Sequence, residues 1–390
     1  MIRIGFLLNY PTSYKGGINY FRNLFYAVNG HFSEEVEILL FVPSNLAQEY
    51  VDLFSPFVKI IKTKALQRKS SLWYLDKVSE KLIGANILLD QLMQKYKIDI
   101  VSHSSFVSKK VKTINWIMDF QHFHFPELYS QKEINAVNRV MQRIIEKGDA
   151  IFLSSFGALK DFESRYAKFS KKVKVLHFVC QPSKELKIVL NTEERDRLVK
   201  KYEINRPFFY LPNQFWAHKN HKLVFEAVLS LKQKGYDPLL VTSGLMSDYR
   251  SKRDHIQELI NFVSKNHLNN NILFLGLIPY EDVSNLLVMS DLIINPSYFE
   301  GWSSTVEEAK TIGKHIALSN IDVHLEQKPE FGIYFNPDNV IELTDILVRV
   351  IEKKSDFQQK SLDSLRENLN LRTKEFASQY IETIKKVLNF

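Results

Sequence analysis

The stretch DLIINPSYFEGWSSTVEEAKTIGKHIALS, residues 291–319, carries the pattern that decides the fold. An apolar run around Ile293 ends at Pro296 and is followed by a polar turn. A helix-forming run then ends at Gly313, a residue typical of helix C-termini, and a second apolar run spans Ile316 to Ser319. Strand, turn, helix and strand in this order predict a parallel βαβ unit.

The same alternation extends through the whole chain and predicts an α/β protein with parallel sheets. In the first half, strands are expected at 2–9, 36–43, 58–63, 98–103, 113–119, 150–154 and 173–179. In the second half, they are expected at 208–212, 239–243, 272–275, 292–295, 316–319 and 333–335. These runs form two doubly wound units of similar size, predicted at residues 1–185 and 186–371 because Gln181-Pro182-Ser183 breaks the pattern. A final helix over 372–390 should pack on another element through apolar residues at helical spacing: Phe376, Tyr380, Ile384 and Val387.

Composition places the chain among soluble proteins. It has 390 residues and a single cysteine, Cys180, so no disulfide can form within it and a reducing, cytoplasmic location is expected. No apolar run approaches the ~20 residues of a spanning helix. The net charge of +8 is unevenly distributed, since residues 1–185 have 26 Lys and Arg against 17 Asp and Glu, a net +9, and the remainder has −1.

The basic residues of the first half cluster beside apolar and aromatic ones. Lys62, Lys64, Arg68 and Lys69 precede the run Leu72-Trp73-Tyr74-Leu75. This mixture is typical of a membrane interface, where each lysine near an anionic surface contributes about 1 kcal/mol. A solvated helix face would produce the same pattern. The sequence therefore predicts peripheral docking on an anionic membrane, with a solvated surface as the alternative, and gives no support for nucleic acid as a partner.

The turn before the helix in the opening stretch is suited to a diphosphate. The first N–H groups of a helix have no intrahelical acceptor, and together with the helix dipole they attract anions. The predicted cradle consists of Gly301, Trp302, Ser303 and Ser304. Glu300 precedes this turn and Glu308 lies about one helical turn beyond it. Carboxylates beside an anion site are expected to accept hydrogen bonds from sugar and ribose hydroxyls. A stabilising acidic first turn would explain Glu308 as well, but not Glu300.

Two further strand-to-helix turns have phosphate-binding features. The run Asn213-Gln214-Phe215-Trp216-Ala217-His218-Lys219 lies between a strand and a helix closed by Gly235, so Lys219 could reach a phosphate. Near the N-terminus, Gly16-Gly17 opens a helix that is expected to stop at Gly30. A plain tight turn would explain the glycine pair equally well.

The spacing of Glu300 and Glu308 resembles the E-x7-E signature of glycosyltransferase family 4, the retaining enzymes of GT-B fold. Similarity is strong from Phe208 to Asn339 and weaker from Met1 to Ser155. The resemblance implies two Rossmann-like domains facing a cleft, with a C-terminal helix crossing back to the first domain. It further implies a hexosyltransferase-type enzyme similar to bacterial surface-polysaccharide transferases, with a nucleotide diphosphate sugar as donor and a glycan or lipid-linked glycan as acceptor.

The resemblance also implies roles for individual residues. Glu308 would bind the donor ribose and Glu300 the transferring sugar, while Lys219 and the amides of Trp302 to Ser304 would bind the diphosphate. Gly17 would border the phosphate and acceptor region, and residues 276–279 would line the base pocket. The family usually has an arginine where this chain has Asn213, so the phosphate clamp loses one charge.

The family pattern leaves open which histidine contacts the donor sugar, and it bears on whether a metal is needed. The histidine that touches the donor sugar has no unambiguous counterpart, since His103 is the nearest match and Asp119, His122 and His124 are alternatives. No cofactor or metal is expected, because no two aspartates are spaced as D-x-D. A nucleotide-sugar epimerase or phosphorylase of similar fold, and a non-enzymatic sugar-binding protein, are the competing interpretations.

Overall fold

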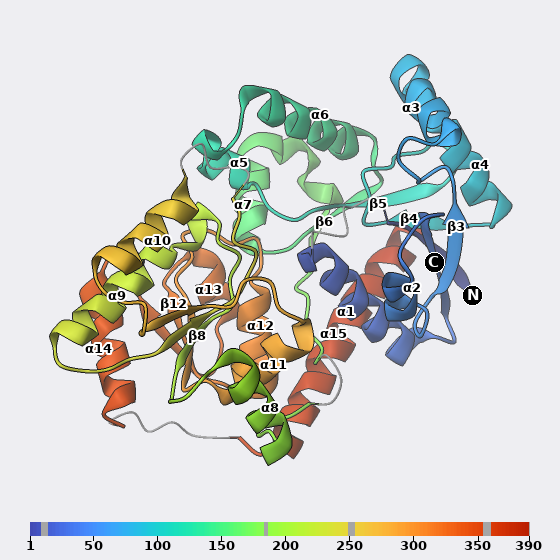
Figure 1. Cartoon of the computed structure of the whole chain (residues 1–390). Coiled ribbons are helices and arrows are strands. Elements are labelled where there is room, and N and C mark those ends of the chain that lie inside the picture. The colour runs from blue at the N-terminus through green and yellow to red at the C-terminus, as the bar shows by residue number, and fades with distance from the viewer. Residues whose placement is uncertain (9–14, 183–185, 249–253, 354–359, 390) are drawn as a thin grey trace. The chain divides into compact units, whose positions relative to one another are not determined.

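The computed structural model describes residues 1–8, 15–182, 186–248, 254–353 and 360–389. The chain forms two units, and each has its own parallel sheet (Figure 1). The first unit comprises residues 1–120, 130–179 and 370–390, and the second comprises residues 121–129 and 180–369. Short β-branched and aromatic runs form the strands. The inner strands β4, β6, β8, β9, β11 and β12 are buried throughout, as expected where helices cover both faces of a parallel sheet, whereas the edge strands β3 and β7 have no buried residue.

The first unit contains a seven-stranded sheet in the order β3-β2-β1-β4-β5-β6-β7. Its strands are β1 (Ile2–Leu7), β2 (Val36–Pro43), β3 (Lys59–Thr63), β4 (Ile100–Ser102), β5 (Lys112–Ile117), β6 (Ala150–Leu153) and β7 (Val173–Val175). Its helices are α1 (Lys15–Phe32), α2 (Gln48–Phe54), α3 (Ser71–Ile83), α4 (Ile87–Lys95), α6 (Gln131–Lys147), α7 (Phe156–Tyr166) and the 3₁₀ helix η2 (Ala167–Lys172). Helix α1 continues past Gly30, which was expected to end it, because Gly30 does not adopt a positive φ.

The second unit contains a six-stranded sheet in the order β10-β9-β8-β11-β12-β13. Its strands are β8 (Phe209–Leu211), β9 (Leu240–Thr242), β10 (Ile272–Phe274), β11 (Leu292–Asn295), β12 (Ile316–Ser319) and β13 (Gly332–Phe335). Its helices are α5 (Gln121–His124), α8 (Thr192–Tyr202), α9 (His221–Gln233), α10 (His255–Lys265), α11 (Tyr280–Met289), α12 (Ser304–Ile312), α13 (Asp322–Gln327) and α14 (Val340–Ile351), with 3₁₀ helices η1 (Pro126–Leu128) and η3 (Ala217–Lys219).

The alternation of side chains along β8 divides the core of the second unit. Phe209 and Leu211 pack in one apolar cluster and Tyr210 in another, because successive side chains of a strand point to opposite faces of the sheet. In both sheets the strand order reverses beside the first strand, at β1/β4 and at β8/β11. Ligands of open α/β sheets bind beyond the carboxyl ends of the strands at such a switch point.

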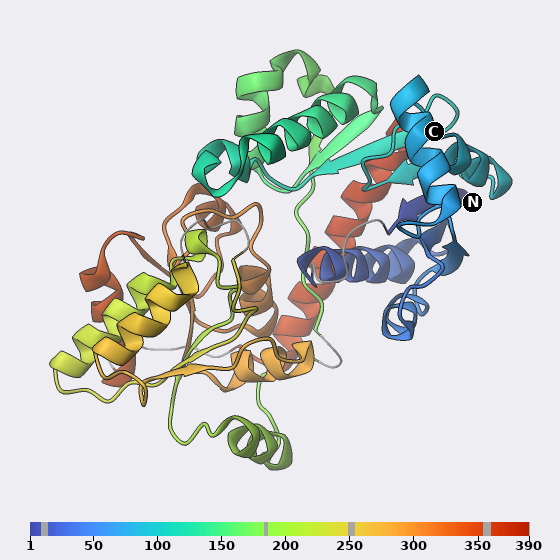
Figure 2. The same ribbon diagram turned by 45° about the horizontal axis from the view of Figure 1, so that its top comes forward.

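The last helix, α15 (Leu362–Leu388), begins ten residues before the expected Arg372. Its residues from Asn370 onward belong to the first unit, as the family resemblance implies. Tyr380 is fully buried with its ring centroid 5.7 Å from that of His103, and the Phe376 ring lies 6.4 Å from Tyr20 on α1. Figure 2 shows the C-terminal part of α15, in red, beside α1, in dark blue. Among the described residues, no helix has the length and apolar character needed to cross a membrane.

The burial of Phe376 gives a stability prediction. Phe376→Ala should lower the free energy of unfolding by about 3–5 kcal/mol, because it removes a buried ring and leaves a cavity. Urea unfolding followed by circular dichroism measures this loss. Leu371→Ala is the matched control on the same helix, since Leu371 is 60% exposed, and it should change stability by less than about 0.5 kcal/mol. Equal losses in the two variants would contradict the packing of α15 on the first unit.

Candidate functional site

The switch point of the second sheet brings two predicted motifs together. Strands β8 and β11 are neighbours, with Leu292 paired to Phe209 and Ile293 paired to Tyr210. The loop after β8 carries Lys219, and the loop after β11 carries Glu300. Because parallel strands end at the same edge of the sheet, residues more than eighty positions apart in sequence meet there.

The short helix η3 fixes the position of Lys219. The backbone N–H of Ala217 donates to Asp248 Oδ2 at 2.8 Å, and Asn220 ends the turn in the left-handed region with φ 53°. Asparagine tolerates this conformation better than most residues. The Asn220 amide donates to the backbone carbonyls of Pro337 at 2.9 Å and Pro296 at 3.3 Å, which ties the turn to the loop after β11.

Lys219 and Glu300 form a buried ion pair. Lys219 Nζ lies 2.6 Å from Glu300 Oε1, and the two side chains are 13% and 9% exposed. Ser297 Oγ donates to the same carboxylate oxygen at 2.7 Å. Burial by itself raises the pKa of Glu300, but Lys219, His324 and Ser297 outweigh it, so that the pKa of this carboxyl is lowered. Glu300 is therefore ionised at neutral pH.

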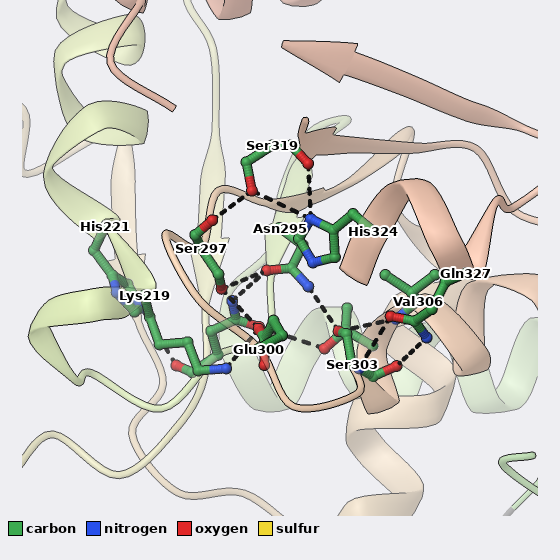
Figure 3. Close-up of polar contacts among 12 residues, drawn as sticks. Lys219, His221, Asn295, Ser297, Glu300, Ser303, Val306, Ser319, His324 and Gln327 are labelled. Carbon is green, nitrogen blue, oxygen red and sulfur yellow. Dashed lines mark hydrogen bonds and ion pairs between the residues drawn. The ribbon is translucent and has the colours of Figure 1, made fainter. Parts of the chain in front are cut away.

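A hydrogen-bonded network behind the pair connects the two loops (Figure 3). Asn295, the last residue of β11, donates to Ser303 Oγ at 2.8 Å, and its side-chain oxygen lies 2.8 Å from Ser297 Oγ. Asn213 donates to the Asn295 oxygen at 3.0 Å, and its own oxygen accepts from Thr305 Oγ1 at 3.4 Å. Both ends of the Asn213 amide are thus used inside the protein, so the structure gives Asn213 a bridging position in place of the expected contact with the donor.

Gln327 on α13 supports the turn that precedes α12. It accepts from the Ser303 N–H at 3.0 Å and donates to the Ser303 carbonyl at 3.0 Å. The predicted cradle therefore loses one N–H, because that of Ser303 is already engaged. The Ser303 hydroxyl caps α12 by accepting from Val306 N–H, and Ser304 is the exposed first residue of the helix.

A second group of residues, on β12 and α13, supports the loop after β11. Ser319 Oγ donates to the Ser297 carbonyl, and His324 Nδ1 lies 2.8 Å from the Ser319 carbonyl. His324 is fully buried, and burial lowers its pKa although the Glu300 carboxylate opposes this shift. Gln327, Ser319 and His324 could not be predicted as supporting residues from the sequence, since they lie on later elements and no spacing connects them to the motif.

Glu308 lies in a pocket of its own on the second unit. The pocket is lined by residues of α11, α12 and the segment after residue 179, including Tyr280, Ser284, Thr311 and Cys180. Tyr280 donates to Glu308 Oε1 at 2.8 Å. Removal from water raises the pKa of Glu308 to about 7, and the hydrogen bond from Tyr280 opposes this rise only in part. The two glutamates of the motif thus differ in charge state, as Glu300 is ionised and Glu308 is about half protonated at neutral pH.

His103 occupies the core of the first unit. It is fully buried at the end of β4 with φ 54°, and its ring nitrogens lie 2.7 Å from the hydroxyls of Tyr20 and Ser102. Its ring stacks on Phe6 and Phe152, and burial lowers its pKa to about 3. This surrounding suits a neutral structural histidine and leaves no face of the ring for a sugar.

The other candidates for the sugar-contacting residue lie on the segment after β5. Asp119 is half-buried just beyond β5, and His122 is buried in α5. The His124 ring lies 5.0 Å from that of Phe299, and the Phe125 ring lies 6.1 Å from it. Because Phe299 directly precedes Glu300, His124 is the histidine alternative whose position beside the motif is established by a ring contact.

The remaining predicted residues stand on helix ends or turns. Gly17 is buried in the first turn of α1, while residues 9–14 lie outside the described part of the chain. Gly301 and Trp302 are half-buried between Glu300 and the start of α12. Within the described ranges, no group of three His, Cys, Asp or Glu residues is placed to hold a metal ion.

Comparison with known families agrees with this geometry. Residues 194–372 match the family described as glycosyl transferases group 1. This range contains Lys219, Glu300 and Glu308. The chain contains a group 1 glycosyltransferase domain. No curated protein sequence matches the chain.

Solved structures resemble the chain over its whole length. A glycosyltransferase from Rickettsia africae ESF-5 is 17% identical with a TM-score of 0.68, covering 99% of this chain and 98% of that one. Anabaena Alr3699/HepE, solved with UDP and glucose, is 14% identical with a TM-score of 0.69, covering 99% and 100%. WaaG, a glycosyltransferase of lipopolysaccharide biosynthesis, is 14% identical with a TM-score of 0.61, covering 98% of each chain. At these identities the likeness shows the fold, which is GT-B. The glycosyltransferase domain is thus part of a chain with that fold throughout.

The ion pair of the glycosyltransferase domain gives a testable prediction. Lys219→Met should lower the free energy of unfolding by about 3–5 kcal/mol, because it leaves the buried Glu300 carboxylate without its cation. The double variant Lys219→Met with Glu300→Gln removes both charges and should recover most of that loss. Thermal and urea unfolding measure both effects. If the double variant is as unstable as the single one, the ion pair does not account for the loss.

Proposed function

We propose that the chain is a retaining, hexosyltransferase-type glycosyltransferase that uses a nucleotide diphosphate sugar as donor. The observation that carries this proposal is the convergence of Lys219 and Glu300 at the β8/β11 switch point. A cation and an acceptor of hydroxyl hydrogen bonds, side by side at that edge of the sheet, match the two chemically different ends of a sugar diphosphate.

Donor binding changes the partner of Lys219. In the free chain its ammonium lies against Glu300, whereas an incoming diphosphate carries more negative charge and accepts hydrogen bonds from the same ammonium. Backbone N–H groups at the start of α12 add partial positive charge beside it. Glu300, relieved of its cation, can accept from the hydroxyls of the transferring sugar. Ser297 still donates to Glu300 and keeps the carboxylate oriented.

Glu308 suits the ribose end of the donor. Its pocket includes Tyr280 at the start of α11, next to the loop of residues 276–279 where the base is expected. The carboxylate form accepts hydrogen bonds from two vicinal hydroxyls. UDP in the structure of Anabaena HepE supports a uridine nucleotide as the first donor to test.

In the transfer step, the bond between the sugar C1 and the diphosphate oxygen breaks while a bond from the acceptor oxygen to C1 forms on the same face. The acceptor proton passes to the departing phosphate, so the family resemblance requires no protein nucleophile. The chain contributes by positioning the donor and by stabilising the charge of the leaving diphosphate through Lys219 and the α12 amides. Metal independence and the absence of a cofactor remain part of this proposal.

The acceptor is proposed to be a glycan or a lipid-linked glycan of bacterial surface-polysaccharide synthesis. The role of WaaG in lipopolysaccharide biosynthesis supports this class. The net charge of +9 in residues 1–185 favours a cytoplasmic protein that docks peripherally on the inner face of the membrane. Gly17, Asp119 and His122 are proposed to lie toward the acceptor and the sugar, together with His124.

Product analysis separates this proposal from its alternatives. With UDP-glucose and lipid-linked or free glycan acceptors, nuclear magnetic resonance of the product should show the anomeric configuration of the donor. An epimerase or phosphorylase would change the donor sugar or release a sugar phosphate without a glycan acceptor. A sugar-binding protein would bind the donor without turnover. Inversion of configuration, or either of these outcomes, would refute the retaining transferase.

Substitution of the motif should abolish transfer without unfolding the chain. Glu308→Ala should reduce donor turnover by at least about a hundredfold, a loss of ~2.7 kcal/mol in transition-state binding. Circular dichroism checks that the fold is retained. Ser284→Ala is a matched control in the same pocket, because its hydroxyl is directed to the Tyr280 carbonyl, and it should leave turnover nearly unchanged. Full activity of Glu308→Ala would remove Glu308 from the site.

The raised pKa of Glu308 predicts a pH dependence of donor affinity. Below about pH 7 the free chain carries a protonated Glu308, and this proton must leave before the carboxylate can accept from ribose. Affinity for the nucleoside diphosphate should therefore rise with pH, by at most about tenfold per unit below pH 7, and then level off. Calorimetry at several pH values measures this profile. Glu308→Gln should remove the inflection, and Tyr280→Phe should move it to higher pH because the tyrosine hydroxyl lowers the pKa. An unchanged inflection in Glu308→Gln would assign it to another group.

A further inference from the structure

Helix α3 turns its polar side toward the protein. Asp76 is 3% exposed and accepts hydrogen bonds from the Asn86 amide at 2.8 Å and from Leu88 N–H at 3.1 Å. Glu80 pairs with Arg143 of α6 and with Lys77. These are the only two acids in the sequence of α3, and both carboxylates are engaged in contacts with the rest of the first unit.

The opposite side of α3 is apolar and faces solvent. Leu75 is 58% exposed, Val78 51% and Leu82 76%. At 3.6 residues per turn these three side chains fall within an arc of about 60°, centred on the side away from Glu80. Leu72 and Tyr74 are also exposed, as is Ile87 just after the helix. We call Leu75, Val78 and Leu82 the α3 face. An ordinary surface helix has the reverse orientation, with its apolar stripe turned inward.

Cations border the α3 face. Lys81 is exposed at one margin of it, and Arg68 and Lys69 are exposed just before the helix. Lys77 is also exposed, but it lies further round the helix, where it pairs with Glu80. Lys62 and Lys64 are exposed in and after the neighbouring strand β3. The region therefore combines an apolar stripe with a one-sided positive border.

This combination fits an anionic bilayer better than a second copy of the chain. Two α3 faces packed against each other about a twofold axis would bring the same lysines together and repel. A helix with an apolar stripe and lysines at its margin lies in the plane of a lipid interface, where the lysines meet the phosphates. At 13 residues, α3 is too short to cross the bilayer, since a span needs about 20.

We propose that α3 docks the chain on an anionic lipid bilayer, with Leu75, Val78 and Leu82 below the headgroups and Lys81 at the level of the phosphates. The proposal deepens the proposed function, and it rests on that function only where it explains access to a lipid-linked acceptor. It also extends the sequence expectation. Of the cluster named from the sequence, Leu72, Tyr74 and Leu75 are exposed, and the apolar surface continues along the helix to Val78 and Leu82.

Vesicle flotation of the full chain tests the contact directly. Vesicles of phosphatidylcholine with about one-third phosphatidylglycerol should bind the chain at low ionic strength, and pure phosphatidylcholine should bind it much less. Leu75→Glu combined with Leu82→Glu should weaken binding at least tenfold, equal to about 1.4 kcal/mol. Lys69→Gln combined with Lys81→Gln should weaken it less and reduce its salt dependence.

The matched control is Ile341→Glu, which places the same charge on an apolar helix residue that is 67% exposed on α14. It should bind vesicles like the unchanged chain. Unfolding temperatures establish that every variant is folded. Equal binding by the α3 variant and the control, or no binding to anionic vesicles, would overturn the proposal.

Two further measurements distinguish a failure of the membrane contact from self-association and from a failure of the proposed function. In sedimentation experiments, the unchanged chain should not self-associate through the α3 face. Self-association that Leu82→Glu abolishes would assign the α3 face to a second copy. Turnover of UDP-glucose with a water-soluble glycan acceptor should be equal in the α3 variant and the unchanged chain. If flotation fails while this turnover persists, α3 is not the membrane contact and the transferase stands. If flotation succeeds without any turnover, the membrane contact stands and the transferase does not.

Discussion

The buried ion pair between Lys219 and Glu300 constrains the whole site. Neither charge could be placed at the edge of the β8/β11 sheet alone, because removal of a charge from water costs several kcal/mol unless a partner compensates. The two loops must therefore be positioned together. The amides of Asn213 and Asn295, the hydroxyls of Ser297 and Ser303 and the side chain of Gln327 provide this positioning, and most of them are fully buried.

The same constraint explains why the two glutamates of the motif are not equivalent. Glu300 has a cation and a hydroxyl donor and stays ionised, whereas Glu308 has a single tyrosine hydroxyl and loses water without gaining a charge partner. In the proposed donor complex, one carboxylate exchanges a cation for sugar hydroxyls and the other exchanges a proton for ribose hydroxyls. Each exchange costs free energy that donor contacts must offset, so both could contribute to discrimination between a complete donor and its fragments.

The sequence was sufficient for the strands, because their β-branched and aromatic runs are short, mostly buried and separated by helix-length stretches. It was sufficient for the packing of Phe376 and Tyr380 for a similar reason, since their helical spacing encodes a buried stripe. Contacts between elements that lie far apart in the chain could not be predicted from the sequence. Gln327 and Ser303 meet only after β12 and α13 have folded back, and Asn213 stands where a ligand contact was expected but bridges two loops. His103 resembled a site residue by its place at a strand end, but its burial among aromatic rings could not be foreseen from that place.

The second unit is built from two separate segments of the chain, and this limits how the protein can be divided into fragments. Residues 121–129 belong to that unit although the chain has not yet completed the first, so the polypeptide passes between the units four times. The rings of His124 and Phe125 that contact Phe299 come from this early segment, outside the residues 194–372 that match the glycosyltransferase family. A fragment limited to the family match would contain both glutamates and the lysine but would lack the aromatic cover beside them. The unit that carries the motif is therefore encoded discontinuously, and the boundaries of a sequence family do not coincide with those of the folded site.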